Sequence, residues 1–398
     1  MLHGWEKLTE QEKELIAKGV ADNRVYGGPF HAELSLTDNC NYDCFFCNQG
    51  FVDRSKSLSL DLLRKLIDEM ADMGLKVTRL SGGGEPLLHP KIKDVLDHLR
   101  QHNITMDNVT TNGFMLIPPV VERLMALPTK EIIVSLNESD AERYAEMMRV
   151  RPGHFDRVVE NMKQLMAARK QLGLHAPSVV AQFFVWKKNY HDVDRMVELT
   201  REIGADRVYL RSIFGLPQEQ RLNQGEQARL KKLTETHIQR EPQEFLAIDY
   251  TFENVFFERE PVGQPRRPCQ GQRDRYCYIG WYSTTIRGNG DVFPCCMLQQ
   301  VPDYPVLGNV KEKPFREIWL GEAYENFRRE LRMIAIQRGE VREPNKLIHT
   351  KPICIAENEC PLLHAMCDDG FYSDMNSQLE RERRSLKQKL LRVFAGRT

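Results

Sequence analysis

Cys40, Cys44 and Cys47 form a C-x3-C-x2-C group, the sequence feature with the clearest chemistry. A cubane iron–sulfur cluster has four irons, so three thiolates leave one iron open to a small molecule. A structural zinc site normally takes four ligands from one neighbourhood, commonly in C-x2-C pairs. His31 is the nearest fourth ligand, at the far end of the preceding predicted strand. The spacing therefore favours an open iron–sulfur cluster over zinc.

The cysteines follow the first of six strand-like segments that alternate with amphipathic helices. These predicted strands are 32–36, 77–81, 108–112, 131–136, 179–185 and 207–211. Repeated βα units predict parallel strands with right-handed crossovers, in a partial barrel or an open doubly wound sheet. Ligands bind at the carboxyl ends of such strands, and the three cysteines lie at one of those ends.

With Phe46 beside its last cysteine, this segment resembles the signature of the radical S-adenosylmethionine (SAM) superfamily. In that family the amino and carboxylate groups of SAM chelate the open iron. An electron from the cluster then cleaves SAM to a 5′-deoxyadenosyl radical, which abstracts hydrogen from a substrate. The resemblance implies an α/β fold, a partial (β/α)6 TIM-like barrel, with a [4Fe–4S] cluster held by Cys40, Cys44, Cys47 and SAM.

Further resemblances stand at the ends of successive predicted strands. The SAM-binding residues they imply are Phe46, Gly83, Gly84, Glu85, Thr111, Asn112, Ser135, Asn137, Arg149 and Arg211. The segment 81–86 is similar to the family's GGE motif, whose backbone and carboxylate hold the SAM amino group. Ser135 and Asn137 match the strand that contacts the ribose, Arg149 and Arg211 are candidates for the SAM carboxylate, and Phe46 is expected near the adenine.

A second cysteine group occupies the C-terminal third of the chain. Cys277-x12-Gly290-x4-Cys295 resembles the opening of SPASM and twitch domains, which carry auxiliary clusters, and 287–292 predicts a tight hairpin. The seven cysteines outside the first group are one short of two fully cysteine-ligated clusters, so we expect one auxiliary [4Fe–4S] cluster in a small α+β domain. Its predicted ligands are Cys277, Cys295, Cys354 and Cys360, with Cys269 and Cys367 as competitors. A zinc-stabilised module is the alternative, because zinc accepts the same thiolates.

Cys296 directly follows a predicted ligand, so we expect its side chain to point away from that of Cys295. A thiol near a substrate radical can donate a hydrogen atom, as in some radical SAM epimerases, and Cys296 is the candidate catalytic residue. Its alternative role is that of a small buried apolar side chain. The other candidate pocket residues, which can equally be packing residues, are Arg211, Tyr278, Trp281 and Tyr282.

Composition limits the classes of protein that remain. A formal net charge of +0 gives no indication of electrostatic binding to nucleic acid or to an acidic membrane. The first residues lack a secretory h-region, and clustered thiols without a secretion signal indicate a reducing, cytoplasmic location. The predicted organisation is an N-terminal helical extension (1–30), the radical SAM core (31–235), a connector (236–268), the auxiliary domain (269–372) and a charged helix (373–398).

The resemblance leaves the fate of the substrate radical open. We expect an oxidoreductase or epimerase acting on a small molecule such as a sugar or aminocyclitol in natural-product biosynthesis, with a flavodoxin- or ferredoxin-type electron donor. The alternative is a maturase that cross-links or epimerises a ribosomal peptide. Such maturases often carry an N-terminal winged helix, and only about forty residues precede Cys40. A non-catalytic electron carrier is the remote alternative.

Overall fold

A single sheet organises the protein in the computed structural model, which describes residues 7–47, 49–50, 52–213, 216–242, 245–248, 278–300 and 304–338. Its parallel part contains β1 (His31–Leu34), β2 (Val77–Leu80), β3 (Thr105–Thr111), β4 (Thr129–Ser135), β5 (Ser178–Val185), β6 (Arg207–Ser212) and β7 (Leu246–Ile248). These strands are hydrogen-bonded in chain order, each parallel to the next. All six predicted strands are therefore confirmed, with ends shifted by up to three residues.

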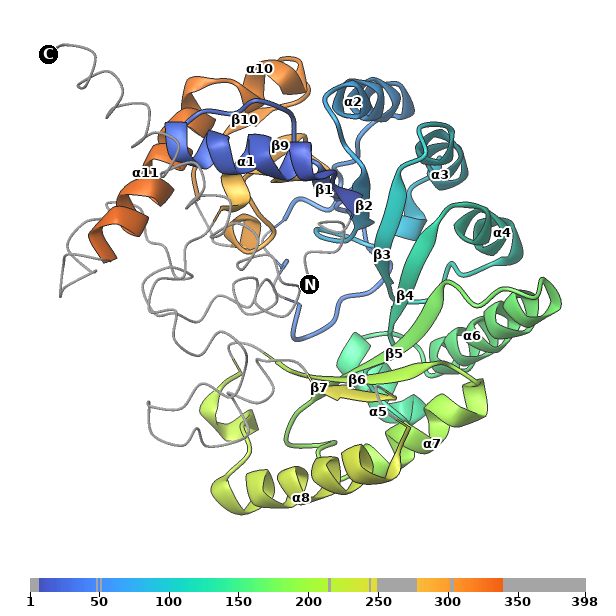
Figure 1. Ribbon diagram of the computed structural model, residues 1–398. Coiled ribbons are helices and arrows are strands. Elements are labelled where there is room, and N and C mark those ends of the chain that lie inside the picture. The colour runs from blue at the N-terminus through green and yellow to red at the C-terminus, as the bar shows by residue number, and fades with distance from the viewer. Residues whose placement is uncertain are drawn as a thin grey trace, which may run out of the picture.

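The strands curve into an arc, and helices lie along its outer side (Figure 1). The outer helices are α2 (Leu60–Asp72), α3 (Ile92–Gln101), α4 (Pro118–Ala126), α6 (Gly153–Gln171), α7 (Val193–Ile203) and α8 (Gln224–Arg240). Each covers the sheet with an apolar stripe; on α2, Leu63, Ile67 and Met70 are fully buried, and Ser59 caps the first turn. Helices on one side of a curved parallel sheet define a partial barrel, as predicted, rather than a doubly wound sheet.

Two elements of the barrel were not predicted. The short strand β7 adds a seventh parallel strand beside β6. Helix α5 (Ala141–Met148) lies between β4 and α6, where the sequence indicated one helix only. Asp140 caps α5 through the backbone N–H groups of Glu142 and Arg143, so a capping residue was present although the eight-residue helix is too short for clear periodicity.

The C-terminal segment continues the same sheet beyond β1. Strand β8 (Ser283–Ile286) pairs in parallel with β1, and β9 (Asp291–Phe293) and β10 (Gly308–Asn309) follow in antiparallel order. The predicted hairpin at 287–292 is confirmed. Gly290 takes φ +95 at its turn, a conformation that residues with a Cβ rarely adopt.

A second, smaller core joins the two ends of the described chain. It contains side chains from α1 (Glu10–Asp22), from the segment around β8 and from α11 (Glu322–Arg338), and α10 (Phe315–Trp319) lies just before α11. Tyr278, Trp281 and Tyr282 are buried here: Tyr282 stacks on Phe30, and the Trp281 indole donates to the Arg24 carbonyl. These three aromatic residues are therefore packing residues. Among the described helices, none is long and apolar enough to span a bilayer.

Candidate functional site: a cysteine loop at the carboxyl ends of the barrel strands

The segment that leaves β1, residues 37–47, carries the three cysteines and is called the cysteine loop below. Its backbone is anchored on both sides. Asp38 N–H donates to the Lys56 carbonyl (2.8 Å), and Phe45 N–H donates to the Met147 carbonyl at the end of α5 (3.2 Å). Arg54 donates to the Tyr42 carbonyl (2.9 Å). These bonds fix the backbone of a loop that has no helix or strand of its own.

Cys40 and Cys44 are half-buried and Cys47 is exposed. Burial raises the pKa of the Cys40 thiol to about 11. Burial also raises the pKa of Cys44, and the charges on Cys40 and Cys47 add to the increase. Cys44 therefore interacts electrostatically with both of the other thiols of the loop. A positively charged metal centre reverses the effect, because it stabilises thiolates that burial disfavours.

The glycine loop, residues 81–86 after β2, packs directly against the cysteine loop. A Cβ on Gly84 would lie 2.2 Å from the Asn39 carbonyl oxygen, and a Cβ on Gly83 would lie 1.8 Å from Asp38 Oδ1. Glu85 N–H donates to the same Asn39 carbonyl (2.8 Å). Glycine at 83 and 84 is therefore needed for the close approach of two loops, whatever ligand binds there.

The Glu85 side chain is buried and joins the glycine loop to the end of β3. Its carboxylate accepts hydrogen bonds from Thr111 Oγ1 (2.7 Å), Asn112 N–H (2.7 Å) and Leu87 N–H (3.1 Å). Burial raises the pKa of Glu85 to about 7 despite these donors. A carboxylate offers about four lone-pair positions, so one remains for a further donor such as an ammonium group. Asn112 in turn donates to Asn41 Oδ1 in the cysteine loop (2.8 Å).

The polar residues predicted on β4 and β6 are bridged by a residue that was not predicted. Gln182 on β5 donates to Ser135 Oγ (3.4 Å) and accepts from Arg211 (3.4 Å). Asn137 N–H donates to the Gln182 carbonyl (2.8 Å), and Asn137 itself has φ 64, a left-handed conformation that Asn tolerates. The structure thus brings Ser135, Asn137 and Arg211 together along three neighbouring strand ends.

Phe46 and Arg149 occupy different surroundings at this edge. Phe46 packs on Phe184 with ring centroids 4.9 Å apart, and Arg211 lies 5.5 Å from the same Phe184 ring. The aromatic residue beside the last cysteine therefore reaches the carboxyl ends of β5 and β6. Arg149 ends α5 and pairs with Asp43 (3.3 Å) at the surface, with 57% of its side chain exposed. Arg149 is thus tied to the outside of the cysteine loop.

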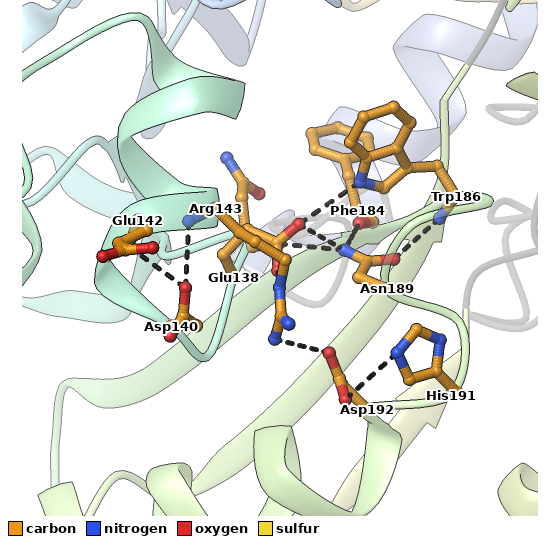
Figure 2. A network of polar contacts seen from close by, with 10 residues as sticks. Glu138, Asp140, Glu142, Arg143, Phe184, Trp186, Asn189, His191 and Asp192 are labelled. Atoms are coloured by element: carbon orange, nitrogen blue, oxygen red, sulfur yellow. Dashed lines mark hydrogen bonds and ion pairs between the residues drawn. The ribbon is translucent and has the colours of Figure 1, made fainter.

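A buried carboxylate, Glu138, directly follows Asn137 and joins a network of polar contacts (Figure 2). Its Oε1 accepts from the Trp186 indole (3.2 Å) and from Asn189 Nδ2 (3.0 Å), and Arg143 lies 3.5 Å from Oε2. Arg143 also pairs with Asp192 at 2.5 Å. Burial raises the pKa of Glu138 to about 7. The network fixes the end of β4 to the loop after β5, whose Trp186 packs on Phe45 of the cysteine loop (4.8 Å between ring centroids).

The inner face of the barrel is polar and charged. On β1, Ala32 and Leu34 belong to the apolar core, so the alternation of the strand places Glu33 on the inner face. Glu33 pairs with Arg79 on β2 (3.1 Å) and accepts from Gln299 Nε2 (2.9 Å), which comes from the C-terminal segment. Asp107 on β3 is buried, which raises its pKa to about 6 while Arg79 lowers it.

The two adjacent cysteines of the C-terminal segment have different surroundings, as predicted. Cys295 is buried in the second core. Cys296 is half-buried and interacts electrostatically with Arg79 of the inner face. The other predicted auxiliary ligands, Cys277, Cys354 and Cys360, lie outside the described residues, as do Cys269, Cys367 and the predicted helix 373–398.

The geometry defines a class: a partial barrel with a soft-metal site and a polar ligand site at the carboxyl ends of its strands. The family model of the radical SAM superfamily matches residues 34–200, and the model of the SPASM iron–sulfur cluster-binding domain matches residues 277–342. The chain therefore belongs to the radical SAM superfamily and carries a C-terminal SPASM domain. The first domain takes a [4Fe–4S] cluster with SAM, and the second takes auxiliary iron–sulfur clusters.

Curated relatives that are similar to this chain are named for different chemistry. The AdoMet-dependent heme synthase of Methanosarcina barkeri is 25% identical over 358 residues, 87% of this chain and 93% of the relative. The antilisterial bacteriocin subtilosin biosynthesis protein AlbA of Bacillus subtilis is 24% identical over 294 residues, 73% of this chain and 59% of the relative.

Among solved structures, SuiB of Streptococcus suis bound to S-adenosylmethionine aligns with a TM-score of 0.59 at 20% identity. The alignment covers 79% of this chain and 71% of SuiB. At this identity the likeness shows the fold, the partial barrel of a radical SAM enzyme.

The residues present fit the cluster and SAM. The loop beside β1 carries three thiols that interact electrostatically, and two buried polar atoms of the same edge, Asn41 Nδ2 and Asn137 Oδ1, have no hydrogen-bond partner among the described residues. One is a donor and the other an acceptor, and SAM supplies a carboxylate and ribose hydroxyls that pair with such groups. Cys40, Cys44 and Cys47 would hold the cluster, with the glycine loop and the ends of β3 to β6 around SAM.

Sequence reasoning missed five polar or aromatic residues of this edge, which are Asn41, Gln182, Glu138, Trp186 and Asn189. Gln182 had a signal, because it is the one polar residue within the apolar run Val179–Val185. Glu138 directly follows the predicted ribose contact Asn137. Trp186 and Asn189 carry no signal, since their partner lies about fifty positions away.

Proposed function

We propose that this chain acts on a small polar substrate held against the inner face of the barrel, such as a sugar or an aminocyclitol, and oxidises or epimerises it. The observation that supports this proposal is the charged inner wall, where Arg79 pairs with Glu33 and interacts electrostatically with Asp107 and Cys296. Charged and hydrogen-bonding side chains in a buried wall suit hydroxyl and amino groups, and they disfavour an apolar ligand. When bound, the cluster and SAM supply a 5′-deoxyadenosyl radical that abstracts hydrogen from a substrate C–H bond.

The residues of the chain then act on the substrate. Arg79, Glu33 and Asp107 bind and orient its polar groups. In an epimerisation, the Cys296 S–H bond breaks and its hydrogen atom forms the new C–H bond on the opposite face of the substrate carbon. One electron and one proton then restore the thiol, with the electron from a flavodoxin- or ferredoxin-type donor. In an oxidation, an auxiliary cluster would accept the second electron from the substrate, the proton would pass to solvent, and Cys296 would take no part.

The test uses anaerobically reconstituted enzyme, SAM and a low-potential reductant in deuterated water. A panel of sugars and aminocyclitols is screened for substrate-dependent 5′-deoxyadenosine, and the products are analysed by mass spectrometry. We expect one solvent deuterium in an epimerised product, and Cys296→Ala should form 5′-deoxyadenosine but no deuterated epimer. An epimer that keeps its deuterium in Cys296→Ala would remove Cys296 from this role. No 5′-deoxyadenosine with any substrate would favour the electron-carrier alternative.

A peptide substrate is the second candidate, and a specific observation favours it. AlbA is named for bacteriocin biosynthesis, and a structure of SuiB contains its precursor peptide SuiA, aligned to this chain with a TM-score of 0.57. The same enzyme is therefore incubated with short peptides. Loss of two hydrogen atoms from a peptide, or deuterium at one α-carbon, would assign the chain to peptide maturation and would overturn the small-molecule proposal.

A further inference from the structure

Two neighbouring helices on the outside of the barrel bring two imidazoles and one carboxylate together. His98 and His102 stand four residues apart at the carboxyl end of α3, so both lie on one face of that helix. Asp68 lies in the last turns of α2. His98 Nε2 and His102 Nε2 are each 2.7 Å from Asp68 Oδ1, and the three ligand atoms lie within 4.8 Å of one another.

The second ring nitrogen of His98 has a partner that suits a metal-binding histidine. Its Nδ1 is 3.2 Å from Gln101 Oε1, while its Nε2 faces Asp68 Oδ1. A neutral imidazole has one N–H, so it donates to only one of these two oxygens, whereas an imidazolium donates to both. When a cation replaces the proton at Nε2, the Nε2 lone pair binds the metal and Nδ1–H donates to Gln101, so the same side-chain geometry serves a metal ligand. Metal-binding histidines almost always donate their second ring nitrogen in this way.

We propose that Asp68, His98 and His102 bind one divalent cation of the zinc class between α2 and α3. Imidazole nitrogens with one carboxylate suit Zn²⁺, which accepts three protein ligands and a water. The exposed fractions of the side chains are 50% for Asp68, 14% for His98 and 29% for His102, so solvent can supply the fourth ligand. The carboxyl end of α3 also favours positive charge.

The position of this site separates it from the SAM chemistry. The carboxyl ends of α2 and α3 lead into the amino ends of β2 and β3, whereas the cysteine loop lies at the carboxyl end of β1. Glu69, the neighbour of Asp68, accepts hydrogen bonds from the backbone N–H groups of Phe315 and Arg316 at the start of α10 (2.9 Å each). A cation bound by Asp68 would therefore fix α2, the helix that also holds the start of α10 through Glu69. Its role is structural.

The experiment uses the reconstituted holoenzyme, so that the cysteines are occupied by iron and sulfide. The protein is dialysed against buffered Zn²⁺ near pH 7.5, and zinc and iron per chain are measured by mass spectrometry. We expect one zinc that is lost in His98→Ala and in His102→Ala while the iron content stays constant. His175→Ala, an exposed histidine away from the site, is the matched control and should keep the zinc.

A second variant tests the argument from hydrogen bonding and leaves all three ligands in place. Gln101→Ala should weaken zinc binding by about 10- to 100-fold, the usual effect of removing such a partner. Circular dichroism without zinc establishes that each variant is folded. Zinc should raise the unfolding temperature of the wild type and of His175→Ala, raise that of Gln101→Ala less, and leave that of His98→Ala and His102→Ala unchanged. Equal zinc content in the wild type, His98→Ala and His102→Ala would overturn the proposal, as would a holoenzyme that retains no zinc beyond adventitious binding.

Discussion

Replacing Glu85 by Gln tests how the glycine loop is fixed to the end of β3. In the folded protein, burial raises the pKa of this carboxyl group from 4.5 to about 7. The folded state therefore binds the proton more tightly than the unfolded state. This contribution to stability is fully present below the unfolded pKa and is lost as the pH rises through the folded value. The full loss corresponds to about 3 kcal/mol, and about 2 kcal/mol of it falls between about pH 5.5 and about pH 8.

The Glu85→Gln protein lacks this titration and keeps the shape of the side chain. Its amide NH2 must face at least one of the donors from Thr111, Asn112 or Leu87, which costs about 1–3 kcal/mol at every pH. We therefore expect the wild type to be more stable than the variant near pH 5.5. The difference should shrink by about 2 kcal/mol near pH 8.

The assay is anaerobic urea unfolding of the reconstituted proteins, followed by tryptophan fluorescence at both pH values. Glu14→Gln, which changes an exposed side chain on α1, is the control and should follow the wild type at each pH. A stability difference between wild type and Glu85→Gln that does not change with pH would refute the reasoning. It would mean that the Glu85 carboxylate is as well solvated in the folded protein as in the unfolded chain.

Three further substitutions have outcomes set by the structure. Gly84→Ala should lower the iron retained per chain, because its Cβ would meet the Asn39 carbonyl oxygen at 2.2 Å, whereas Gly153→Ala, with nothing within 4 Å, should retain wild-type iron. Glu138→Ala leaves buried indole and amide donors unpaired and should cost about 2–4 kcal/mol in urea unfolding; an effect below about 1 kcal/mol would contradict the network. Arg149→Gln removes an exposed ion pair and should change stability by less than about 1 kcal/mol. A large fall in SAM affinity, measured by calorimetry, would then identify Arg149 as a ligand of SAM.

Much of the barrel could be predicted because its signals are local. The six strands and their amphipathic helices follow from periodicity, and the hairpin at 287–292 follows from turn residues around Gly290. The strand β7 and the helix α5 were not predicted, because three and eight residues are too few to show a hydrophobic period. The parallel pairing of β8 with β1 was not predicted either, because it joins positions about 250 residues apart and no local pattern encodes such a contact.

The sequence by itself determined the cluster chemistry, since the spacing of Cys40, Cys44 and Cys47 and the order of the strand ends are properties of the chain. Only the tertiary structure decided how those ends are joined. Gln182 links β4 to β6, and Glu138 holds the end of β4 to the loop after β5. Only the tertiary structure likewise shows that Tyr282 is a packing residue of the second core. Burial and hydrogen-bond partners depend on which distant segments fold against a residue, so they are fixed only when the whole sheet is assembled.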